Sequence, residues 1–491
     1  MAMMPYFELT QETFLHFILI RPSTEVSGVT YSSSRFLSMP FGCLYLIYHL
    51  EQNGITTAFF DDVDQDSIDE IFDAITDDTV AVGISSMSGT QFKKAILIAD
   101  NIRQRTDLPL VWGGVHVTHL PEQSCMDHLV DYCLVGEGEE RLPILLKAIE
   151  SGDVEGAASV PGVFTESGPN IPLEKGQLYT NLKQKIDLPY DILDMERYVR
   201  PLLVGPKRET LCWTSRGCPY SCRFCSNPSN AWPNTRVRLH SIDHVVDEIK
   251  LLTNKYGVDG IHFTDENFVL SENRLLKLFK RLEAENISCS YRFSGRVDGL
   301  LKLKESTYAY LKEVGVISIA SAPESGSQHV LDIMGKGIRS EQIFELDEML
   351  TRHRFNKTYN ILFGVPGETL EDVNQTIDMI VKIAKNSTYC PYPFAYPALY
   401  IPLPGTELYT DAVRAGFQPP STFQGWGYFD LEKAQDTLEQ IRPWISGEYK
   451  AHLFKAMKEI VALIETMTGK DLDPVAFEKQ VAALSQMSSH S

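Results

Sequence analysis

Residues 214–225 read TSRGCPYSCRFC and hold three of the nine cysteines of this 491-residue chain. Cys218, Cys222 and Cys225 stand on one short segment with the spacing Cys-x3-Cys-x2-Cys. Gly217 and Pro219 keep that segment out of a helix and allow it to curl. Thiolate is the ligand that iron–sulfur clusters prefer, and three cysteines for the four irons of a cubane leave one iron open. The spacing therefore predicts a 4Fe–4S cluster with a free coordination position.

Two other kinds of metal site are compatible with these cysteines. One is zinc, with Cys212 or His240 as a fourth ligand, and the other is a fully ligated cluster that serves structure alone. Zinc sites favour paired Cys-x2-Cys units, and the chain has a single such pair, at Cys222 and Cys225. The remaining cysteines are scattered and their total is odd, so the sequence does not suggest a disulfide framework. The open cluster is the favoured interpretation.

Downstream of the cysteines, apolar strands and helical segments alternate at a spacing of about 30 residues. In the segment 242–256 the apolar residues recur on one helical face. Together with the strand before the cysteines, six βα units predict a partial (βα)6 barrel over residues 206–405, with its chemistry at the carboxyl ends of the strands. The expected strands are 209–214, 259–264, 288–294, 316–320, 359–363 and 394–401.

Polar residues follow most of these strands. Asp265 follows the second strand, Ser294 and Arg296 the third, and Glu324 the fourth. The fifth strand leads into residues 364–369, which read GVPGET. Each of these residues alone is compatible with a helix cap or a turn. Their recurrence at successive strand ends favours a ligand shell at the barrel mouth.

The first third of the chain also alternates strands and helices, which predicts a doubly wound, Rossmann-like parallel sheet. Ligands of such sheets bind at the carboxyl ends of the strands, and small residues gather there, at 21–24, 85–89, 113–116 and 136–139. No Gly-x-Gly-x-x-Gly follows the first strand, which argues against a dinucleotide site. The expected strands are 14–20, 56–60, 80–84, 108–112 and 132–135, with a helix at 92–102.

Composition and the positions of glycine and proline indicate the class of the protein and the limits of its domains. Lys and Arg total 45 against 65 Asp and Glu, and the net charge of −20 argues against non-specific nucleic-acid binding. No apolar stretch is long enough to span a membrane, and no targeting segment is evident, so we expect a cytoplasmic protein. We expect residues 1–155 to form the first domain, Gly- and Pro-rich residues 156–205 a surface linker, and residues 406–491 a helical region that packs on the barrel or closes its mouth.

The cysteine spacing resembles the signature of the radical SAM superfamily, and the resemblance covers residues 206–405. It implies that the open iron chelates S-adenosylmethionine (SAM), and that one electron from the cluster splits SAM into methionine and a 5′-deoxyadenosyl radical. Several residues match that family's SAM contacts. They are Phe224, Gly364 and Pro366 near the adenine, Glu324 at the ribose, and Ser294 and Arg296 near the carboxylate, with Asp265 added from its strand end.

Residues 10–150 resemble the cobalamin-binding domain that precedes the barrel in many radical SAM enzymes. The resemblance rests on VWGGVHVTHLPE (111–122), VDYCLVGEGEE (130–140) and the Pro-Phe-Gly at 40–42. The motif Asp-x-His-x-x-Gly, whose His ligates cobalt, is missing, because Gly114 precedes His116 by two places and His119 follows it by three. The resemblance thus implies cobalamin held without a protein imidazole ligand. The implied cobalamin contacts are Ser23, Thr24, Pro40, Gly42, Ser85, Ser86, Gly113, Gly114, Val115, His116, Thr118, Gly136, Glu137 and Gly138.

Together these resemblances imply a cobalamin-dependent radical SAM enzyme. They favour a C-methyltransferase that moves a methyl group from SAM, by way of methylcobalamin, to an unactivated carbon after the adenosyl radical removes a hydrogen. The alternative is a cyclisation or rearrangement that uses the same cofactors. A methylthiotransferase is disfavoured because Cys43, Cys125 and Cys133 are too far apart for a second cluster. A cobalamin sensor or electron carrier does not explain the open iron. The expected partners are a small-molecule substrate and a reductant such as flavodoxin or ferredoxin.

Overall fold

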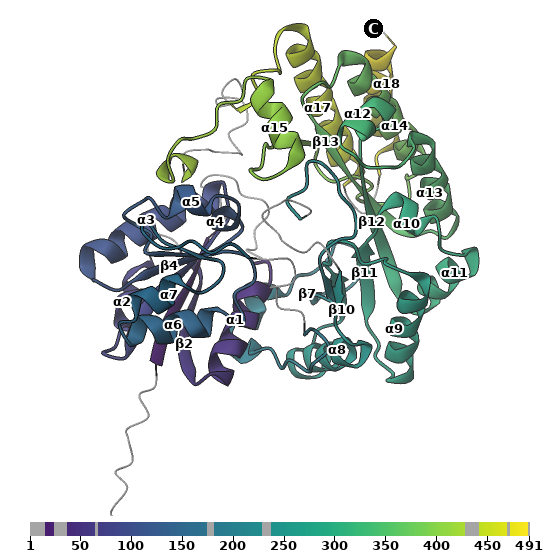
Figure 1. The fold of residues 1–491 in the computed structure, drawn as a ribbon. Helices are drawn as coiled ribbons and strands as arrows, with labels where there is room; N and C mark the ends of the chain where they lie inside the picture. The colour runs from purple at the N-terminus through teal and green to yellow at the C-terminus, as the bar shows by residue number, and fades with distance from the viewer. Residues whose placement is uncertain are drawn as a thin grey trace, which may run out of the picture.

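The computed structural model describes residues 15–23, 37–63, 67–173, 181–227, 237–427, 441–468 and 472–489. Two α/β units stand side by side, each built on its own six-stranded sheet (Figure 1). The N-terminal unit is purple and blue, the half-barrel beside it is teal and green, and the C-terminal helices in yellow lie next to the last strands of the half-barrel. Within these residues no helix combines the length and the apolar character that crossing a lipid bilayer requires.

The first sheet has the strand order β2-β1-β3-β4-β5-β6, and all neighbours are parallel except β5 and β6. Ile18 and Ile20 pack with helix α3, whereas Phe17 and Leu19 pack with α1 and α6, so both faces of the sheet are covered. This confirms the doubly wound fold. The elements are β1 Leu15–Pro22, α1 Phe41–Gln52, β2 Ile55–Val63, α2 Asp69–Asp73, β3 Thr79–Ser86, α3 Thr90–Arg105, β4 Leu110–Gly114, α4 Val115–His119, α5 Pro121–Ser124, β5 Tyr132–Leu134, α6 Leu142–Glu150, α7 Val154–Ala158 and β6 Val163–Phe164.

The segment 156–205, which we expected to be a surface linker, is partly built into both units. Strand β6 pairs with β5 through Phe164 and Cys133 and extends the first sheet. Farther along, Leu182, Tyr190 and Tyr198 are buried in the core of the half-barrel, because apolar side chains stand between the glycines and prolines. Two short 3-10 helices, η2 Tyr190–Ile192 and η3 Met195–Tyr198, form in this segment.

The second sheet has the order β14-β13-β12-β11-β10-β7, and every pair is parallel. This confirms the six-stranded half-barrel. The last strand is shorter than the predicted 394–401, because Pro397, inside that range, lacks the N–H that a ladder needs. The elements are β7 Glu209–Cys212, β8 Ser215–Arg216, β9 Arg238–Leu239, α8 Ile242–Tyr256, β10 Gly260–Phe263, α9 Glu272–Ala284, β11 Ser290–Ser294, α10 Val297–Leu300, α11 Glu305–Glu313, β12 Val316–Glu324, α12 Gln328–Ile333, α13 Ser340–Arg352, β13 Asn356–Phe363, α14 Leu370–Lys385, β14 Ala398–Leu399 and α15 Glu407–Arg414.

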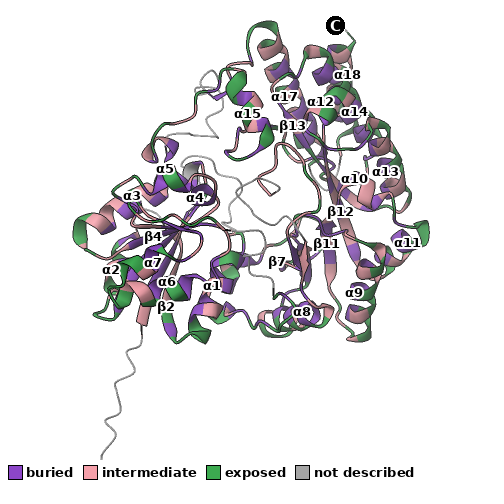
Figure 2. Ribbon diagram, in the orientation of Figure 1, coloured by how far each residue is buried: buried purple, intermediate pink, exposed green. Residues whose placement is uncertain are grey.

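The C-terminal region contacts both units. Helices α17 (Gly447–Met467) and α18 (Pro474–Ser488) pack against α14, and their apolar stripes join the half-barrel core. The short helix η4 (Gln424–Gly427) packs instead on α3 of the first unit. Figure 2 shows buried residues along the strands and on the inward faces of the helices.

Candidate functional site

The three cysteines predicted to hold a cluster lie on the segment that follows β8. Cys218, Cys222 and Cys225 are partly exposed free thiols. Among the described residues, no three His, Cys, Asp or Glu side chains converge closely enough to bind a single metal ion. Three separate thiols on one curled segment fit the corners of a polynuclear cluster better than the ligand shell of one ion.

The residues considered as a fourth zinc ligand are engaged elsewhere. Cys212 is fully buried in β7. Nε2 of His240 lies 2.9 Å from the hydroxyl oxygen of Tyr45, a residue of the first unit. Burial of Cys212 and the contact between His240 and Tyr45 give neither side chain a recorded contact with the three cysteines among the described residues.

Arg223, between the second and third cysteines, fastens their segment to the half-barrel. Its Nη2 donates to Oδ2 of Asp411 at 2.6 Å, and its Nη1 donates to the Ile333 carbonyl at 2.9 Å. Its backbone N–H donates to the Met334 carbonyl, and its own carbonyl accepts from the Leu408 N–H, both at 2.9 Å. Asp411 stands 188 positions farther along the chain. No local pattern in the sequence could have identified this anchor.

Arg296, predicted near the SAM carboxylate, reaches the cysteine segment from the end of β11. Its Nη1 donates to Sγ of Cys222 at 3.3 Å, and its guanidinium carbon lies 3.7 Å from the ring centroid of Tyr220. Asp298 accepts from Nε at 2.9 Å and orients the side chain. Arg296 therefore links the end of β11 to the cysteine segment. Ser294, predicted with it, is the partly buried last residue of β11.

Glu324 and Lys336 form a pair next to Phe224. Nζ of Lys336 lies 3.5 Å from Oε1 of Glu324 and 5.5 Å from the Phe224 ring centroid. Burial raises the pKa of Glu324, and the nearby Lys336 opposes that shift. Glu324 has φ +74°, a conformation that non-glycine residues adopt mainly at functional sites. Sequence reasoning missed Lys336 because its Gly-Lys-Gly turn follows helix α12 and not a strand.

Asp265, which we predicted as a SAM contact, is turned back toward the strand that leads into the cysteines. Oδ1 accepts from Thr214 Oγ1 at 2.8 Å and from Ser215 Oγ, and both carboxylate oxygens accept from the Thr214 N–H at 3.1–3.2 Å. Burial raises the pKa of Asp265 to about 6. Asp265 therefore braces the turn after β7, and its contact with SAM stays a prediction.

The loop after β13, predicted beside the adenine, is held by the C-terminal region. The Gly364 N–H donates to Oε2 of Glu368 at 2.5 Å, and the Gly364 carbonyl accepts from Nε1 of Trp444 at 2.9 Å. The Tyr449 hydroxyl donates to the same Glu368 oxygen at 2.5 Å. Burial raises the pKa of Glu368 to about 7. Pro366, the other predicted residue, is partly exposed in this loop.

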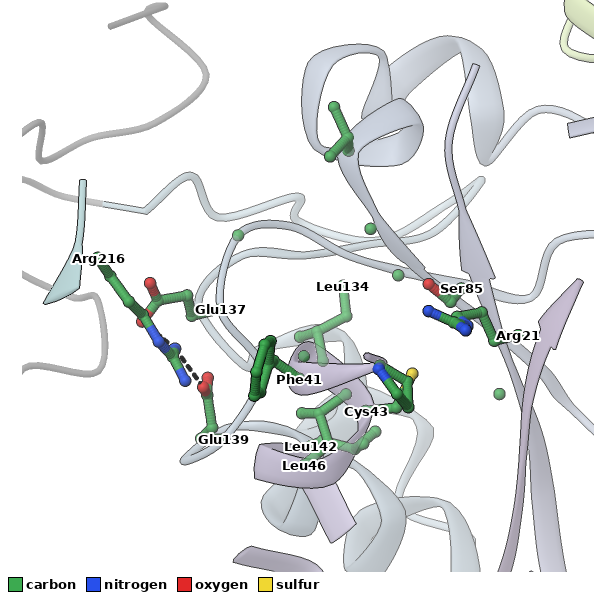
Figure 3. A pocket seen from close by; sticks show the side chains of 18 of the residues that line it. Arg21, Phe41, Cys43, Leu46, Ser85, Leu134, Glu137, Glu139, Leu142 and Arg216 are labelled. Atoms are coloured by element: carbon green, nitrogen blue, oxygen red, sulfur yellow. Dashed lines mark hydrogen bonds and ion pairs between the residues drawn. The ribbon is translucent and has the colours of Figure 1, made fainter. Parts of the chain in front are cut away.

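A cavity of about 590 Å³ opens between the two units (Figure 3). Its first wall is the carboxyl edge of the first sheet, with Leu134 and helix residue Leu142, and its second wall includes Gly217 and Cys225 from the cysteine segment. Both sheets therefore direct the loops after their strands into one space. The predicted cobalamin contacts that line it are Pro40, Gly42, Ser85, Gly113, Gly114, Val115, Gly136, Glu137 and Gly138.

Two of these glycines keep the cavity open. A Cβ on Gly42 would meet nothing within 4 Å, and one on Gly113 would meet only the Leu134 carbonyl oxygen at 4.0 Å. Any side chain at either position would project into the cavity. A large open space with a glycine and leucine floor fits a bulky, flat ligand such as a corrin ring.

Four other predicted cobalamin contacts, Ser23, Ser86, His116 and Thr118, are described by the structure but are not among the residues that line the cavity. Ser86 and Thr118 bond to the backbone of the glycine turns and so shape the edge indirectly. Ser23 is buried behind that edge, and Thr24 lies outside the described residues. His116 packs among aromatic side chains.

His116 points into an aromatic cluster on the far side of the edge. Its ring centroid lies 3.8 Å from that of Phe92, and Phe423 and Trp426 of the C-terminal region cover it. Nδ1 lies 3.0 Å from Oγ of Ser88. Burial lowers the pKa of His116 to about 3, so the ring is neutral. Aromatic side chains thus enclose the neutral ring, and the contact of His116 with cobalamin stays a prediction.

Sequence reasoning missed much of the cavity wall. Phe17 and Leu19 reach it from β1, and Arg216 and Arg238 reach it from the strands that flank the cysteine segment. The alternation of residues along β1 could have identified the two apolar side chains, since residues two apart share one face. The arginines carry no such local signal.

Two family models match the chain. The B12 binding domain matches residues 29–146, and the radical SAM superfamily matches residues 214–380. An uncharacterized methyltransferase of Pyrococcus horikoshii is 27% identical over 407 residues, which is 81% of this chain and 83% of the relative. The anaerobic magnesium-protoporphyrin IX monomethyl ester cyclase of Rubrivivax gelatinosus is 23% identical over 368 residues, or 72% and 65%.

One solved structure has the same fold over most of the chain. It is the radical S-adenosylmethionine methyltransferase TsrM of Kitasatospora setae with cobalamin and a [4Fe-4S] cluster bound. The TM-score is 0.63 at 20% identity, and the match covers 83% of this chain and 76% of the other. At that identity the likeness is one of architecture, with a B12 unit placed before a half-barrel.

Proposed function

The chain belongs to the radical SAM enzymes that carry a cobalamin-binding domain, and we propose that it is a C-methyltransferase acting on a small molecule. Its cofactors are a 4Fe–4S cluster, SAM and cobalamin. The methyl group would come from SAM and would end on a carbon that no neighbouring group activates. The match to an uncharacterized methyltransferase, which covers about four-fifths of this chain, supports this assignment.

One observation carries the proposal, the shared cavity between the units. Ser85, Gly113 and Gly138 line it from the first sheet, and Gly217 and Cys225 line it from the cysteine segment. A substrate in this space would lie within reach of both sites. Methyl transfer from one cofactor to a carbon activated by the other requires such an arrangement.

When both cofactors are bound to the protein, the cluster supplies the electron that cleaves SAM, and the corrinoid serves as the methyl carrier. The protein's part is to hold and orient them. Cys218, Cys222 and Cys225 would bind three irons and leave the fourth open. Arg296, donating to Cys222, would help to hold that side chain in position.

Glu324 and Lys336 would hold SAM beside the cysteine segment. Glu324 offers a carboxylate for ribose hydroxyls, and its buried partner Lys336 keeps that carboxylate in place. The Gly364 loop, held by Trp444, would offer its backbone to the adenine. On the other wall, Leu134 and Leu142 would exclude water from the corrin face.

The first test is cofactor content and SAM turnover. The protein would be purified without oxygen from cobalamin-supplemented cells and assayed for iron, sulfide and corrinoid. We expect about four irons and one corrinoid per chain, and S-adenosylhomocysteine and 5′-deoxyadenosine after reduction in the presence of substrate. Replacing Cys222 by Ala should remove iron and SAM cleavage while corrinoid is still found in the purified protein. Cys289→Ala, outside the segment, should change neither the iron nor the corrinoid content.

Iron without corrinoid would overturn the methyltransferase proposal. A second candidate, ring closure with the same cofactors, is favoured by the match to the cyclase. It predicts 5′-deoxyadenosine without S-adenosylhomocysteine, so the same assay separates the two. In either case we propose that an external reductant such as flavodoxin or ferredoxin supplies the electron.

A further inference from the structure

Two arginines stand at the base of the cysteine segment. Arg216 ends β8, two positions before Cys218, and Arg238 begins β9, where the chain returns. The two strands are antiparallel, and Arg216 lies directly opposite Arg238. Like charges opposite one another destabilise a strand pair, so this base requires acidic partners.

The acidic partners come from the other unit. Glu137 binds Arg238 through both oxygens, at 2.6 Å and 2.5 Å. Nη1 of Arg216 donates to Oε1 of Glu139 at 2.5 Å and lies 3.1 Å from Oε2 of Glu137 (Figure 3). The four side chains are 3–12% exposed, so solvent screens these pairs little. We call Glu137, Glu139, Arg216 and Arg238 the Glu–Arg clamp.

A second element of the first unit supports the same base. The guanidinium carbon of Arg216 lies 4.2 Å from the ring centroid of Tyr45 in α1. The Tyr45 hydroxyl is 2.9 Å from Nε2 of His240, the residue after β9. The first unit therefore contacts both strands of the base, and the position of the cysteine segment depends on that unit as well as on the half-barrel.

We propose that the Glu–Arg clamp couples the two cofactor sites, with Glu137 and Glu139 as positioning residues. The glutamates alternate with Gly136 and Gly138, which line the cavity on the corrinoid side, and Cys225 lines it opposite them. A ligand that shifts this turn must shift the base of the cysteine segment. Thermodynamic linkage makes this coupling reciprocal. The factor by which the cluster changes the affinity for the corrinoid equals the factor by which the corrinoid changes the affinity for the cluster. The inference needs the two cofactors but not methyl transfer.

The test is equilibrium dialysis of hydroxocobalamin against the full-length protein without oxygen, with the cluster assembled and with it removed. In the wild type we expect the two dissociation constants to differ about tenfold. In Glu139→Gln, which keeps the shape but removes the charge, the ratio should fall close to one. The matched control is Glu407→Gln, which neutralises an acid 3.1 Å from Arg223 of the same segment but on the half-barrel side. The control should retain the wild-type ratio.

A milder variant keeps the test decisive if Glu139→Gln does not fold. Arg238→Lys retains the charge but loses the two-point contact with Glu137, and it should give an intermediate ratio. Two results would overturn the proposal. One is equal dissociation constants with and without the cluster in the wild type, and the other is a ratio in the folded clamp variants that equals the ratio of the wild type. Production of S-adenosylhomocysteine plays no part in this measurement, so the coupling and the methyltransferase proposal fail separately.

Discussion

At the scale of single residues, buried carboxyl groups determine how this protein responds to pH. Glu248 of α8 accepts a hydrogen bond from the Tyr190 hydroxyl, and its second oxygen lies 3.6 Å from Nε2 of His244. Burial raises the pKa of Glu248 from 4.5 to about 7. Below pH 4.5 both the folded and the unfolded chain keep this proton. Between pH 4.5 and 7 only the folded chain keeps it, so the folded state loses stability as the pH rises through that window.

Replacing Glu248 by Gln should therefore stabilise the protein at high pH. The amide still accepts from Tyr190 but carries no charge to bury. At pH 8 we expect the free energy of unfolding to rise by up to about 3 kcal/mol, and at pH 4.5 we expect no gain. Urea unfolding followed by circular dichroism at both pH values checks this. A gain that is equal at the two pH values would show that the pKa of Glu248 is not raised.

At the scale of elements, the end of β4 determines the shape of the corrinoid side of the cavity. Its last two residues are both glycine but for different reasons. Gly113 faces open space, whereas Gly114 has φ +98° and a Cβ there would lie 2.4 Å from the Ser86 carbonyl oxygen. One glycine keeps room for a ligand, and the other allows the turn into α4.

Substitutions at these neighbours should separate binding from stability. Gly113→Val should weaken hydroxocobalamin binding at least tenfold by filling the cavity, with the urea midpoint unchanged. Gly114→Ala should lower the free energy of unfolding by about 1–3 kcal/mol through backbone strain. Dialysis and urea unfolding of both variants provide the comparison. Normal corrinoid affinity in Gly113→Val would place the ligand elsewhere.

At the scale of the whole molecule, the C-terminal region joins the two units. Phe423 and Trp426 pack around His116, and Nε1 of Trp426 donates to Oε1 of Gln123 at 2.7 Å. From the same region, Trp444 and Tyr449 hold the loop after β13 in the half-barrel. The two walls of the cavity are thus held in place by one stretch of chain.

Trp426→Ala should loosen that connection. A buried Trp replaced by Ala costs about 3–5 kcal/mol, and we expect a lower thermal midpoint and faster cleavage in limited proteolysis. Val475→Ala, at a position that is 80% exposed, is the matched control and should behave as wild type. If Trp426→Ala is cleaved no faster than the control, the C-terminal region does not hold the units together.

Local pattern alone was sufficient to predict the cysteine triad, the helix at 242–256 and the two sheet classes. Ligand spacing and hydrophobic periodicity are properties of neighbouring residues, so they are readable without a fold. The same holds for the glycine turns at 113–114 and 136–138, because parallel strands bring their carboxyl ends to one edge. The cysteine spacing alone predicts the open cluster, and the resemblance that these motifs carry implies SAM and cobalamin.

Tertiary structure alone decided which of those residues face the cavity and which brace it. Asp265 turns to Thr214 and His116 turns into an aromatic cluster, although each stands where a ligand contact was expected. Lys336 and the Glu–Arg clamp join residues from different elements or different units. Such pairings depend on how packed units dock, and a side chain takes whichever partner lies nearest in three dimensions. Local sequence patterns do not reveal the distance between two side chains that are far apart along the chain.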